Sequence, residues 1–277
     1  MHRLLTGDLQ VEQVEIRIVD LPMALSGTRI VQLSDFHYDG LRLSNAMLEG
    51  AIAACTHANP HLVALTGDFV TDDPQPIWAL AEALRGITRQ HKTVAVLGNH
   101  DYAQPTAKDT ITAALTQAGV QVLWNEIAYP LGEPFPVVGM ADFWSREFHP
   151  ERVFGQLDPA VPRLVLSHNP DSAEILAPWR VDLQLSGHTH GGQMDLPALG
   201  NPFAAYFGTA EKLPKPIRQW MPYMRQQCYK IVRHWEWAQG LHRVGSNQLY
   251  VNRGLGTYPP GRFRCPPEVT VLTLHPA

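Results

Sequence analysis

The chain carries the stretch Gly187-His188-Thr189-His190-Gly191-Gly192 directly after residues 181–186, an apolar run typical of a buried strand. Residues two apart on extended backbone point to the same side, so the imidazoles of His188 and His190 can converge on one point. The flanking glycines let the backbone pass close to whatever lies there. Two converging imidazoles at a strand end indicate a transition-metal site. The alternative is a surface turn that happens to contain two histidines.

Four earlier apolar runs also end in residue types that bind metal ions. These runs are 29–33, 61–65, 93–97 and 163–166. The residues that follow them, in chain order, are Asp35 and His37, Asp68, Asn99 and His100, and His168. Functional residues of open α/β sheets lie beyond the carboxyl ends of the strands, so five strands that end in this way predict one metal site.

Helical patterns alternate with the first of these strands, which favours an α/β architecture. The helices are predicted at 43–58, 77–87 and 108–118. Further strands are predicted at 11–19, 136–140, 249–251 and 268–274. No repeat, low-complexity tract or linker divides the sequence, so we expect a single domain over residues 1–277.

The composition restricts the class of protein. Hydrophobic residues make up 45% of the 277 residues and charged residues 17%, as in a soluble globular protein. The net charge of −4 gives no reason to expect binding to nucleic-acid duplexes. The three cysteines are widely spaced and form no CxxC pair, which argues against a disulfide framework and favours a reducing compartment. We see no signal peptide and no transmembrane segment, so we expect a cytoplasmic protein.

The ordered series Asp-x-His, Gly-Asp, Gly-Asn-His-Asp, a lone His and Gly-His-x-His resembles the calcineurin-like metallophosphoesterases. The variant Gly-His-Thr-His-Gly-Gly-Gln at 187–193, with 252–256 and Pro-Pro-Glu at 266–268, is similar to a bacterial branch of phosphodiesterases of the YaeI and YkuE type. The resemblance covers about 29–193 and 249–274. It implies the family's four-layer α/β/β/α sandwich, with two central sheets flanked by helices, and the hydrolysis of phosphoric esters.

The resemblance also implies two divalent metal ions in one pocket. It assigns Asp35, His37 and His190 to the first ion, Asn99, His168 and His188 to the second, and Asp68 to a position bridging the two. Two cations about 3.5–4 Å apart can neutralise the phosphoryl oxygens and generate a bridging hydroxide near neutral pH. A mixed oxygen and imidazole donor set suits Mn, Fe or Zn better than Ca or Mg, and we expect Mn.

Four further residues are candidates for a role in catalysis or in substrate binding. In the family, the equivalent of His100 lies beside the phosphate, where it donates to an oxygen or protonates the leaving group. Asp101 is placed to orient that imidazole, and the alternative for Asp101 is an ordinary turn or helix-cap carboxylate. The family places Asn252 and Arg253 near the pocket, and for Arg253 substrate contact and simple surface placement both stand.

The sequence after Gly67 restricts the class of phosphoester that is expected as the substrate. Protein phosphatases of the superfamily carry Gly-Asp-x-Val-Asp-Arg-Gly and Gly-Asn-His-Glu, whereas residues 67–73 read Gly-Asp-Phe-Val-Thr-Asp-Asp and the second motif ends in Asp101. The arginine that would hold a phosphomonoester is missing from the motif, which favours a phosphodiester or a pyrophosphate.

Three functional classes therefore stand. The first is a phosphodiesterase or pyrophosphatase, including one that acts on a lipid-linked substrate, since some superfamily relatives cleave UDP-diacylglucosamine in lipid A synthesis. The second is a general phosphodiesterase acting on nucleotides or small diesters. The third is a scaffold that retains the fold without catalysis, and the intact motifs argue against it.

A long interval before residue 252 contains a feature that the family motifs do not explain. We expect 196–246 to be an irregular or helical insert that forms a lid, with an apolar helical stripe over 217–235. The residues of this stripe and its basic flanks include Trp220, Met224, Arg225, Arg233 and Trp235. Such a helix can lie in a membrane interface or cover a site for an acyl-chain substrate. The alternative is that it packs on the domain's own core.

Membrane contact by the insert is testable because its charge is local. Seven basic and two acidic residues between 211 and 243 leave a charge of +5, and each cation near an anionic surface contributes about 1 kcal/mol. We expect the protein to sediment with anionic phospholipid vesicles at low salt and to be released by high salt. Arg225→Glu combined with Arg233→Glu should abolish sedimentation and spare hydrolysis of a small soluble diester. Wild-type protein that stays in the supernatant at low salt would contradict peripheral contact with the inner face of a membrane.

Overall fold

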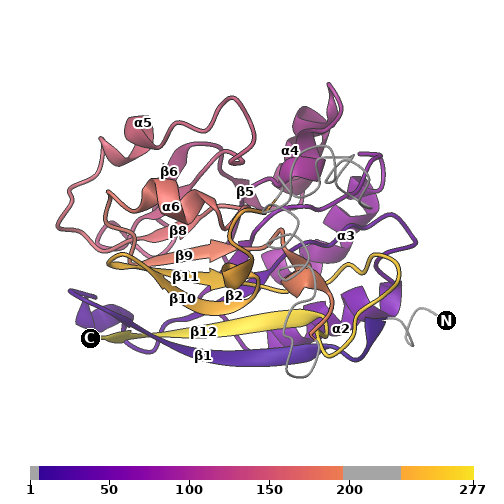
Figure 1. Ribbon diagram of the computed structural model, residues 1–277, viewed down its shortest axis with the longest axis horizontal. Helices are drawn as coiled ribbons and strands as arrows, with labels where there is room; N and C mark the ends of the chain where they lie inside the picture. Colours follow the sequence, from indigo (N-terminus) through magenta and orange to yellow (C-terminus); the bar gives the residue numbers. More distant parts are fainter. Residues whose placement is uncertain (1–5, 196–231) are drawn as a thin grey trace, which may run out of the picture.

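Two six-stranded β-sheets form the centre of the molecule in the computed structural model, which describes residues 6–195 and 232–277 (Figure 1). The first sheet has the order β1 (Gln10–Ile18), β12 (Glu268–Pro276), β2 (Arg29–Leu33), β3 (Leu62–Leu65), β4 (Thr93–Ala95) and β5 (Gln121–Val122). The second has the order β10 (Gly240–Val244), β11 (Asn247–Val251), β9 (Leu183–Ser186), β8 (Leu164–Leu166), β7 (Val137–Gly139) and β6 (Glu126–Ala128).

Most of the strands run parallel within their sheet. Strands β2 to β5 are parallel in the first sheet, and β12 pairs antiparallel with β2 and parallel with β1. In the second sheet β7, β8, β9 and β11 are parallel, and β6 and β10 are antiparallel strands at the two edges. The carboxyl ends of the parallel strands within each sheet therefore meet at a common edge.

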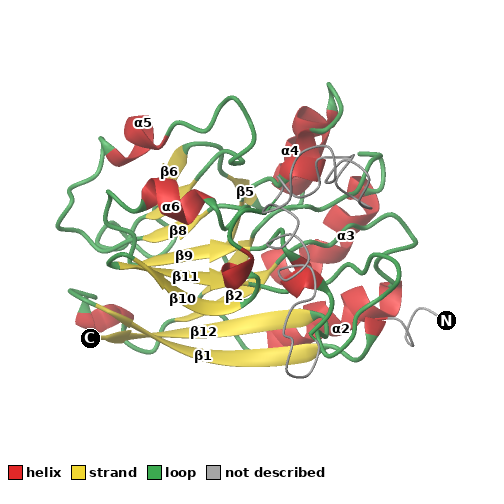
Figure 2. Ribbon diagram, in the orientation of Figure 1, coloured by secondary structure: helices red, strands yellow, loops and turns green. Residues whose placement is uncertain are grey.

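Helices cover the outer faces of both sheets (Figure 2). Helices α2 (Asn45–His57), α3 (Ile77–Thr88) and α4 (Ala107–Gln117) lie against the first sheet, and α5 (Pro150–Phe154) and α6 (Ser172–Leu176) lie beside the second. Short 3₁₀ turns occupy Met23–Leu25, Asn99–Tyr102, His190–Gly192 and Trp235–Trp237. Helix α2 begins after Ser44, whose hydroxyl accepts a hydrogen bond from the Met47 N–H and so caps the helix.

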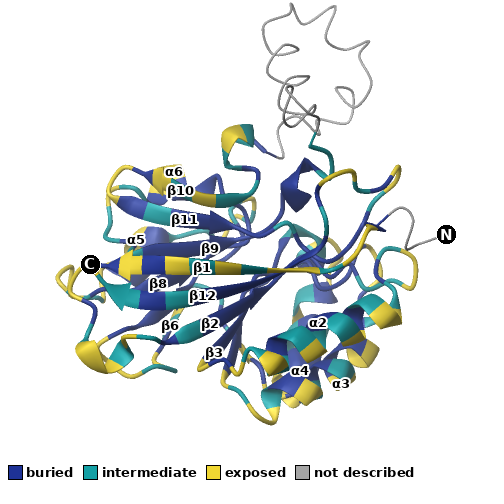
Figure 3. Ribbon diagram, turned by 90° about the horizontal axis from the view of Figure 1, so that it is seen from below, coloured by how far each residue is buried: buried dark blue, intermediate teal, exposed yellow. Residues whose placement is uncertain are grey.

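Alternation of side chains along the strands places apolar side chains on both faces of each sheet, so that adjacent layers pack through apolar cores. In β3, Val63 and Leu65 pack toward helices α2 to α4, whereas Ala64 faces the second sheet. In β8, Leu164 faces the first sheet and Val165 packs with residues of α5 and α6. Because both faces of each sheet are covered, the central strands are buried along their length, as Figure 3 shows.

The predicted four-layer α/β/β/α architecture is confirmed, and each predicted strand and helix up to residue 186 has a counterpart in the structure. Strands β5 and β6 and helices α5 and α6 were not predicted, because segments of two to five residues are too short to show a clear periodicity. None of the helices in the described ranges combines the length and the apolar character needed to cross a membrane.

The predicted insert differs from the structure at its described end. Residues 240–244, within the interval 196–246, form edge strand β10, so this part belongs to the second sheet. Residues 232–234 are not helical, because the backbone N–H groups of Arg233 and His234 donate to the Asp171 carboxylate at 2.7 and 3.0 Å. The helix predicted over 217–235 is therefore wrong at that end. The positions of Trp220, Met224 and Arg225 lie outside the described residues.

Two glycines in different environments test this packing. Gly139 in β7 lies so close to Leu123 that an added Cβ would be 2.2 Å from the Leu123 Cβ atom, so Gly139→Ala should lower the free energy of unfolding by about 1–3 kcal/mol. A Cβ added at Gly50 in α2 would lie 3.7 Å from the Leu9 side chain, an ordinary contact, so Gly50→Ala should raise the free energy of unfolding by about 0.5–1 kcal/mol. Urea denaturation of both variants checks this pair, and equal effects would contradict the packing described.

Candidate metal centre

The predicted metal ligands, together with His100 and Asp101, lie on five loops that begin where β2, β3, β4, β8 and β9 end. The two sheets are stacked so that these loops meet, three from the first sheet and two from the second. Six of the seven predicted ligands have buried side chains there: Asp35, His37, Asp68, His168, His188 and His190. The convergence predicted from the strand ends is therefore found in the structure.

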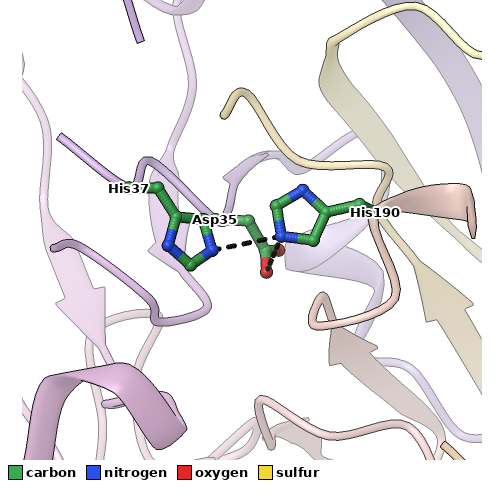
Figure 4. Close-up of side chains that lie close together, drawn as sticks. All are labelled: Asp35, His37 and His190. Atoms are coloured by element: carbon green, nitrogen blue, oxygen red, sulfur yellow. Dashed lines mark hydrogen bonds and ion pairs between the residues drawn. The ribbon is translucent and has the colours of Figure 1, made fainter. Parts of the chain in front are cut away.

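The described residues contain three groups with metal-binding geometry, of which His37, Asp68 and His100 overlap the other two. Asp35, His37 and His190 form the first of those other two, the first cluster (Figure 4). The Nε2 atoms of His37 and His190 are 3.1 Å apart, and His190 Nε2 is 3.5 Å from Asp35 Oδ1. Figure 4 shows the two imidazoles and the carboxylate pointing toward one another. One oxygen and two ring nitrogens therefore face a common point.

Asp68, His168 and His188 form the second cluster. His168 Nε2 lies 3.2 Å from His188 Nδ1 and 3.2 Å from Asp68 Oδ2. The same Asp68 oxygen is 3.4 Å from Nε2 of His37 in the first cluster. Asp68 therefore lies between the two clusters, in the position expected of a bridging carboxylate.

Backbone carbonyl groups fix the orientation of two of these imidazoles. His168 Nδ1 is 2.7 Å from the Thr66 carbonyl oxygen, and His190 Nδ1 is 3.2 Å from that of Gly256. A carbonyl oxygen can only accept, so each Nδ1 carries a hydrogen, and Nε2 offers its lone pair when the ring is neutral. That is the form of imidazole that binds a metal ion.

The ends of the strands turn sharply at the clustered residues. Asp35, His37, Asp68, His188 and His190 all have positive φ, between 43° and 72°. Few residues other than glycine adopt this conformation, and non-glycine examples concentrate at functional sites. The sharp turns lie where the side chains gather into the clusters at the strand ends.

Two glycines of the motifs are required by the carboxylates beside them. A Cβ at Gly98 would lie 2.2 Å from Asp68 Oδ1, and a Cβ at Gly187 would lie 2.2 Å from Asp35 Oδ2. Neither position can hold a side chain without moving a buried carboxylate. The glycines of the Gly-Asn-His-Asp and Gly-His-x-His motifs therefore set how closely the loops approach.

Burial and neighbouring charges shift the pKa values of the clustered groups in different directions. Burial raises the pKa of Asp35 to about 6 and lowers the pKa of His37 to about 3. Burial also lowers the pKa of His168, but the neighbouring Asp68 carboxylate outweighs it and raises that pKa to about 10. For Asp68 itself, burial is outweighed by His168 and His100, so its pKa falls well below the usual range. The site combines a negative carboxylate with a neutral His37 imidazole at neutral pH.

The donor set fits a pair of transition-metal cations. Asn99 Oδ1 is buried and has no hydrogen-bond partner among the residues that the structure describes, although buried amide oxygens are normally satisfied. A cation ligated by this oxygen would satisfy it. The unsatisfied oxygen of Asn99, on the 3₁₀ turn after β4, is therefore consistent with its place as the seventh predicted ligand.

The structure supports different partners for His100 and Asp101 from those expected. His100 Nδ1 donates to the Thr71 carbonyl at 2.8 Å, whereas the Asp101 carboxylate accepts from the backbone N–H groups of Phe69 and Gly98, both at 2.8 Å. Thr71, which the sequence reasoning missed, therefore orients His100, and Asp101 joins the loops that follow β3 and β4. The ring nitrogens of His100 also lie within reach of His37 and Asp68, so geometry alone admits a ligand role for it.

The side chains of Asn252 and Arg253 bind neighbouring residues of the protein. Asn252 is fully buried and donates to the Thr270 hydroxyl at 2.8 Å. The Arg253 guanidinium makes ion pairs with Glu12 and Glu268, both at 2.6 Å. These contacts do not support the predicted substrate contacts, since both side chains bind neighbouring residues of the fold.

Two residues predicted for the lid lie within the described part of the chain. Arg233 packs over aromatic rings, with its guanidinium carbon 5.6 and 5.3 Å from the ring centroids of Phe143 and Trp144. Trp235 begins a 3₁₀ turn. Asp142, the residue before Phe143, accepts a hydrogen bond of 2.6 Å from the hydroxyl of Tyr102. Tyr102 is the last residue of the 3₁₀ turn that starts at Asn99, so Phe143 and Trp144 flank the loop after β4.

Two oxygen and imidazole clusters with one carboxylate between them, at the strand ends of two stacked sheets, form a candidate metal centre of the kind that metal-dependent phosphoesterases use. The chain belongs to the calcineurin-like phosphoesterase family, whose model matches residues 28–192. It is 34% identical over 253 residues to phosphodiesterase YaeI of Escherichia coli, covering 89% of this chain and 82% of that protein. The protein is accordingly a metal-dependent phosphoester hydrolase.

Two further relatives extend the comparison. The chain is 30% identical over 265 residues to the uncharacterized metallophosphoesterase YkuE of Bacillus subtilis, covering 92% of this chain and 81% of that protein. It is 28% identical over 302 residues to the UDP-2,3-diacylglucosamine pyrophosphatase LpxG of Chlamydia trachomatis, covering 90% of this chain and 84% of that protein. The similarity extends well beyond the family model, into the C-terminal strands.

Metal stoichiometry tests the arrangement of the two clusters. Protein reconstituted with Mn and freed of excess metal should hold two ions per chain by elemental analysis. Asp68→Ala should lose both, because Asp68 Oδ2 faces both clusters, whereas Asp35→Asn should lose mainly one, because Asp35 belongs to the first cluster alone. The exposed Asp109 offers a control, and Asp109→Ala should keep both ions. Equal losses in the Asp68 and Asp35 variants would contradict the bridging position.

Proposed function

We propose that the protein hydrolyses a phosphodiester or a pyrophosphate in preference to a phosphomonoester. The supporting observation is how three arginines are used among the residues that the structure describes. Arg42 pairs with Asp39, Arg253 pairs with two glutamates, and Arg262 donates to the carbonyl groups of residues 253, 254, 256 and 265. A monoester dianion needs more positive charge than a diester monoanion, and these three guanidinium groups are already engaged by acceptors of the protein.

We further propose how the clustered residues divide the work. Asp35, His37 and His190 would hold one ion, Asn99, His168 and His188 the other, and Asp68 both, with Mn favoured and Fe or Zn as alternatives. When bound, the ions would supply positive charge for the phosphoryl oxygens and lower the pKa of the attacking water. His100, held at Nδ1 by Thr71, presents Nε2 to the clusters, where it can donate to a phosphoryl oxygen or protonate the leaving oxygen.

A lipid-linked pyrophosphate is the substrate class that we favour. Its support is the similarity to LpxG, a UDP-2,3-diacylglucosamine pyrophosphatase, together with the basic and apolar pattern of the interval 196–246. Such a substrate would be met at the inner face of a membrane by a cytoplasmic enzyme with peripheral contact. The second candidate is a small soluble diester, which the similarity to phosphodiesterase YaeI favours.

Hydrolysis of matched chromogenic substrates tests the preference for a diester. The Mn-loaded protein should cleave bis(p-nitrophenyl) phosphate with a higher kcat/KM than p-nitrophenyl phosphate. Nucleotide sugars and lipid-linked pyrophosphates in the same assay separate the two candidate classes. A faster reaction with the monoester would overturn the proposal, and selective cleavage of a lipid-linked pyrophosphate would support the favoured class.

Replacement of His100 separates chemistry from metal binding. If His100 contacts the phosphate, His100→Ala should keep both metal ions and lose about 10²–10⁴-fold in kcat, the usual loss on removal of such a group. The exposed His57 is the control, and His57→Ala should match the wild type in both properties. Loss of metal together with activity would instead make His100 a ligand.

A further inference from the structure

Gln193 ends the stretch 187–193 and has no part in the proposed ligand set. Its carboxamide makes two hydrogen bonds with the backbone of Tyr258, 65 residues away. Oε1 accepts from the Tyr258 N–H at 2.6 Å, and Nε2 donates to the Tyr258 carbonyl at 3.2 Å. Beside this pair, the Phe263 N–H donates to the Gln193 carbonyl at 2.8 Å. Gln193 therefore fastens the loop that carries Tyr258 to the turn that carries His190.

The side chain of Tyr258 reaches the first cluster. Its hydroxyl oxygen is 3.1 Å from Nδ1 of His37. The ring meets His37 and His190 edge to face, with centroids 5.0 and 5.4 Å away, and the Arg42 guanidinium carbon lies 4.5 Å from its centroid. Contacts with two imidazoles and a guanidinium, together with the hydrogen bonds from Gln193 to the Tyr258 backbone, restrict the position of the hydroxyl.

His37 depends on side-chain oxygens for its orientation, unlike His168 and His190, which are held by backbone carbonyls. An imidazole that offers a lone pair at Nε2 carries its hydrogen at Nδ1, and the Tyr258 hydroxyl oxygen is placed to accept it. The other oxygen near Nδ1, the Thr71 hydroxyl, is at 3.5 Å and donates its own hydrogen to Asp39 at 3.1 Å. Tyr258 is the nearer partner.

We infer that Gln193 and Tyr258 form a positioning pair for His37: Gln193 holds the Tyr258 backbone so that the Tyr258 hydroxyl fixes the ring orientation and tautomer that let His37 Nε2 bind a metal ion. The inference rests on the proposed function, in which His37 is a ligand of the first ion. It gives the glutamine of the motif a role in metal binding without contact with the metal.

Removal of one oxygen atom tests the pair. Tyr258→Phe keeps the ring and should weaken binding of one of the two Mn ions by about 10–100-fold, the usual effect of losing a partner of a metal ligand, while the other ion binds as in the wild type. The measurement is a calorimetric titration of chelator-treated protein with manganese chloride. Tyr250→Phe is the matched control, because it removes another tyrosine hydroxyl, bonded to Glu268 at 2.6 Å, and should leave both affinities unchanged.

Gln193→Ala tests the link between the two residues. If Gln193 acts through the Tyr258 hydroxyl, Gln193→Ala should weaken the same ion, and adding it to Tyr258→Phe should cause less than a twofold further loss. Additive losses in the double variant, or wild-type affinity in Gln193→Ala, would overturn the coupling. Circular dichroism of each variant shows that the fold is retained.

The outcomes for the wild type and the variants distinguish the two proposals. Wild-type protein that binds fewer than two Mn ions would overturn the proposed centre, and the inference with it. Wild-type protein with two ions, together with a Tyr258→Phe variant that holds both at wild-type affinity, would overturn the inference alone.

Discussion

The buried carboxylate of Asp68 is the group on which the rest of the site depends. One of its oxygens accepts from the backbone N–H of His100 at 3.0 Å, and the other faces imidazoles of both clusters. A charge buried in this way is costly unless positive charge and hydrogen bonds surround it, so the neighbouring loops must supply both. The residues that surround Asp68 come from both sheets, and this requirement explains why the sheets must be stacked with their strand ends together.

The backbone around the site is shaped by the same requirement. Side chains at the ends of straight strands would stand apart, and the left-handed residues at these ends bring them inward. The close approach leaves room only for glycine at positions 98 and 187. The apolar cores on both faces of each sheet provide the rigidity that keeps these strained turns in place.

The α/β alternation and the convergence of the ligands could be predicted from local patterns, namely apolar runs and the residues that end them. The stacking of two sheets in four layers was implied by the family resemblance and not by those patterns. The supporting contacts could not be predicted in this way. Thr71 acts through its backbone carbonyl, which any residue possesses, and Tyr258 is remote in sequence from His37. Asp101 was given the wrong partner because a residue adjacent in sequence need not be adjacent in space: within a 3₁₀ turn the Asp101 side chain points back to Gly98.

The position of β12 also has a consequence for the order in which the chain can fold. This strand contains residues 268–276, yet it lies inside the first sheet, between β1 and β2. On the ribosome, the strands and loops that carry the clustered residues emerge long before it, and the sheet beneath them stays open until it arrives. The loop that supplies Gly256 and Tyr258 leads directly into β12. Completion of the sheet and of the shell around the metal centre therefore follows synthesis of the clustered residues, and both depend on residues 252–276.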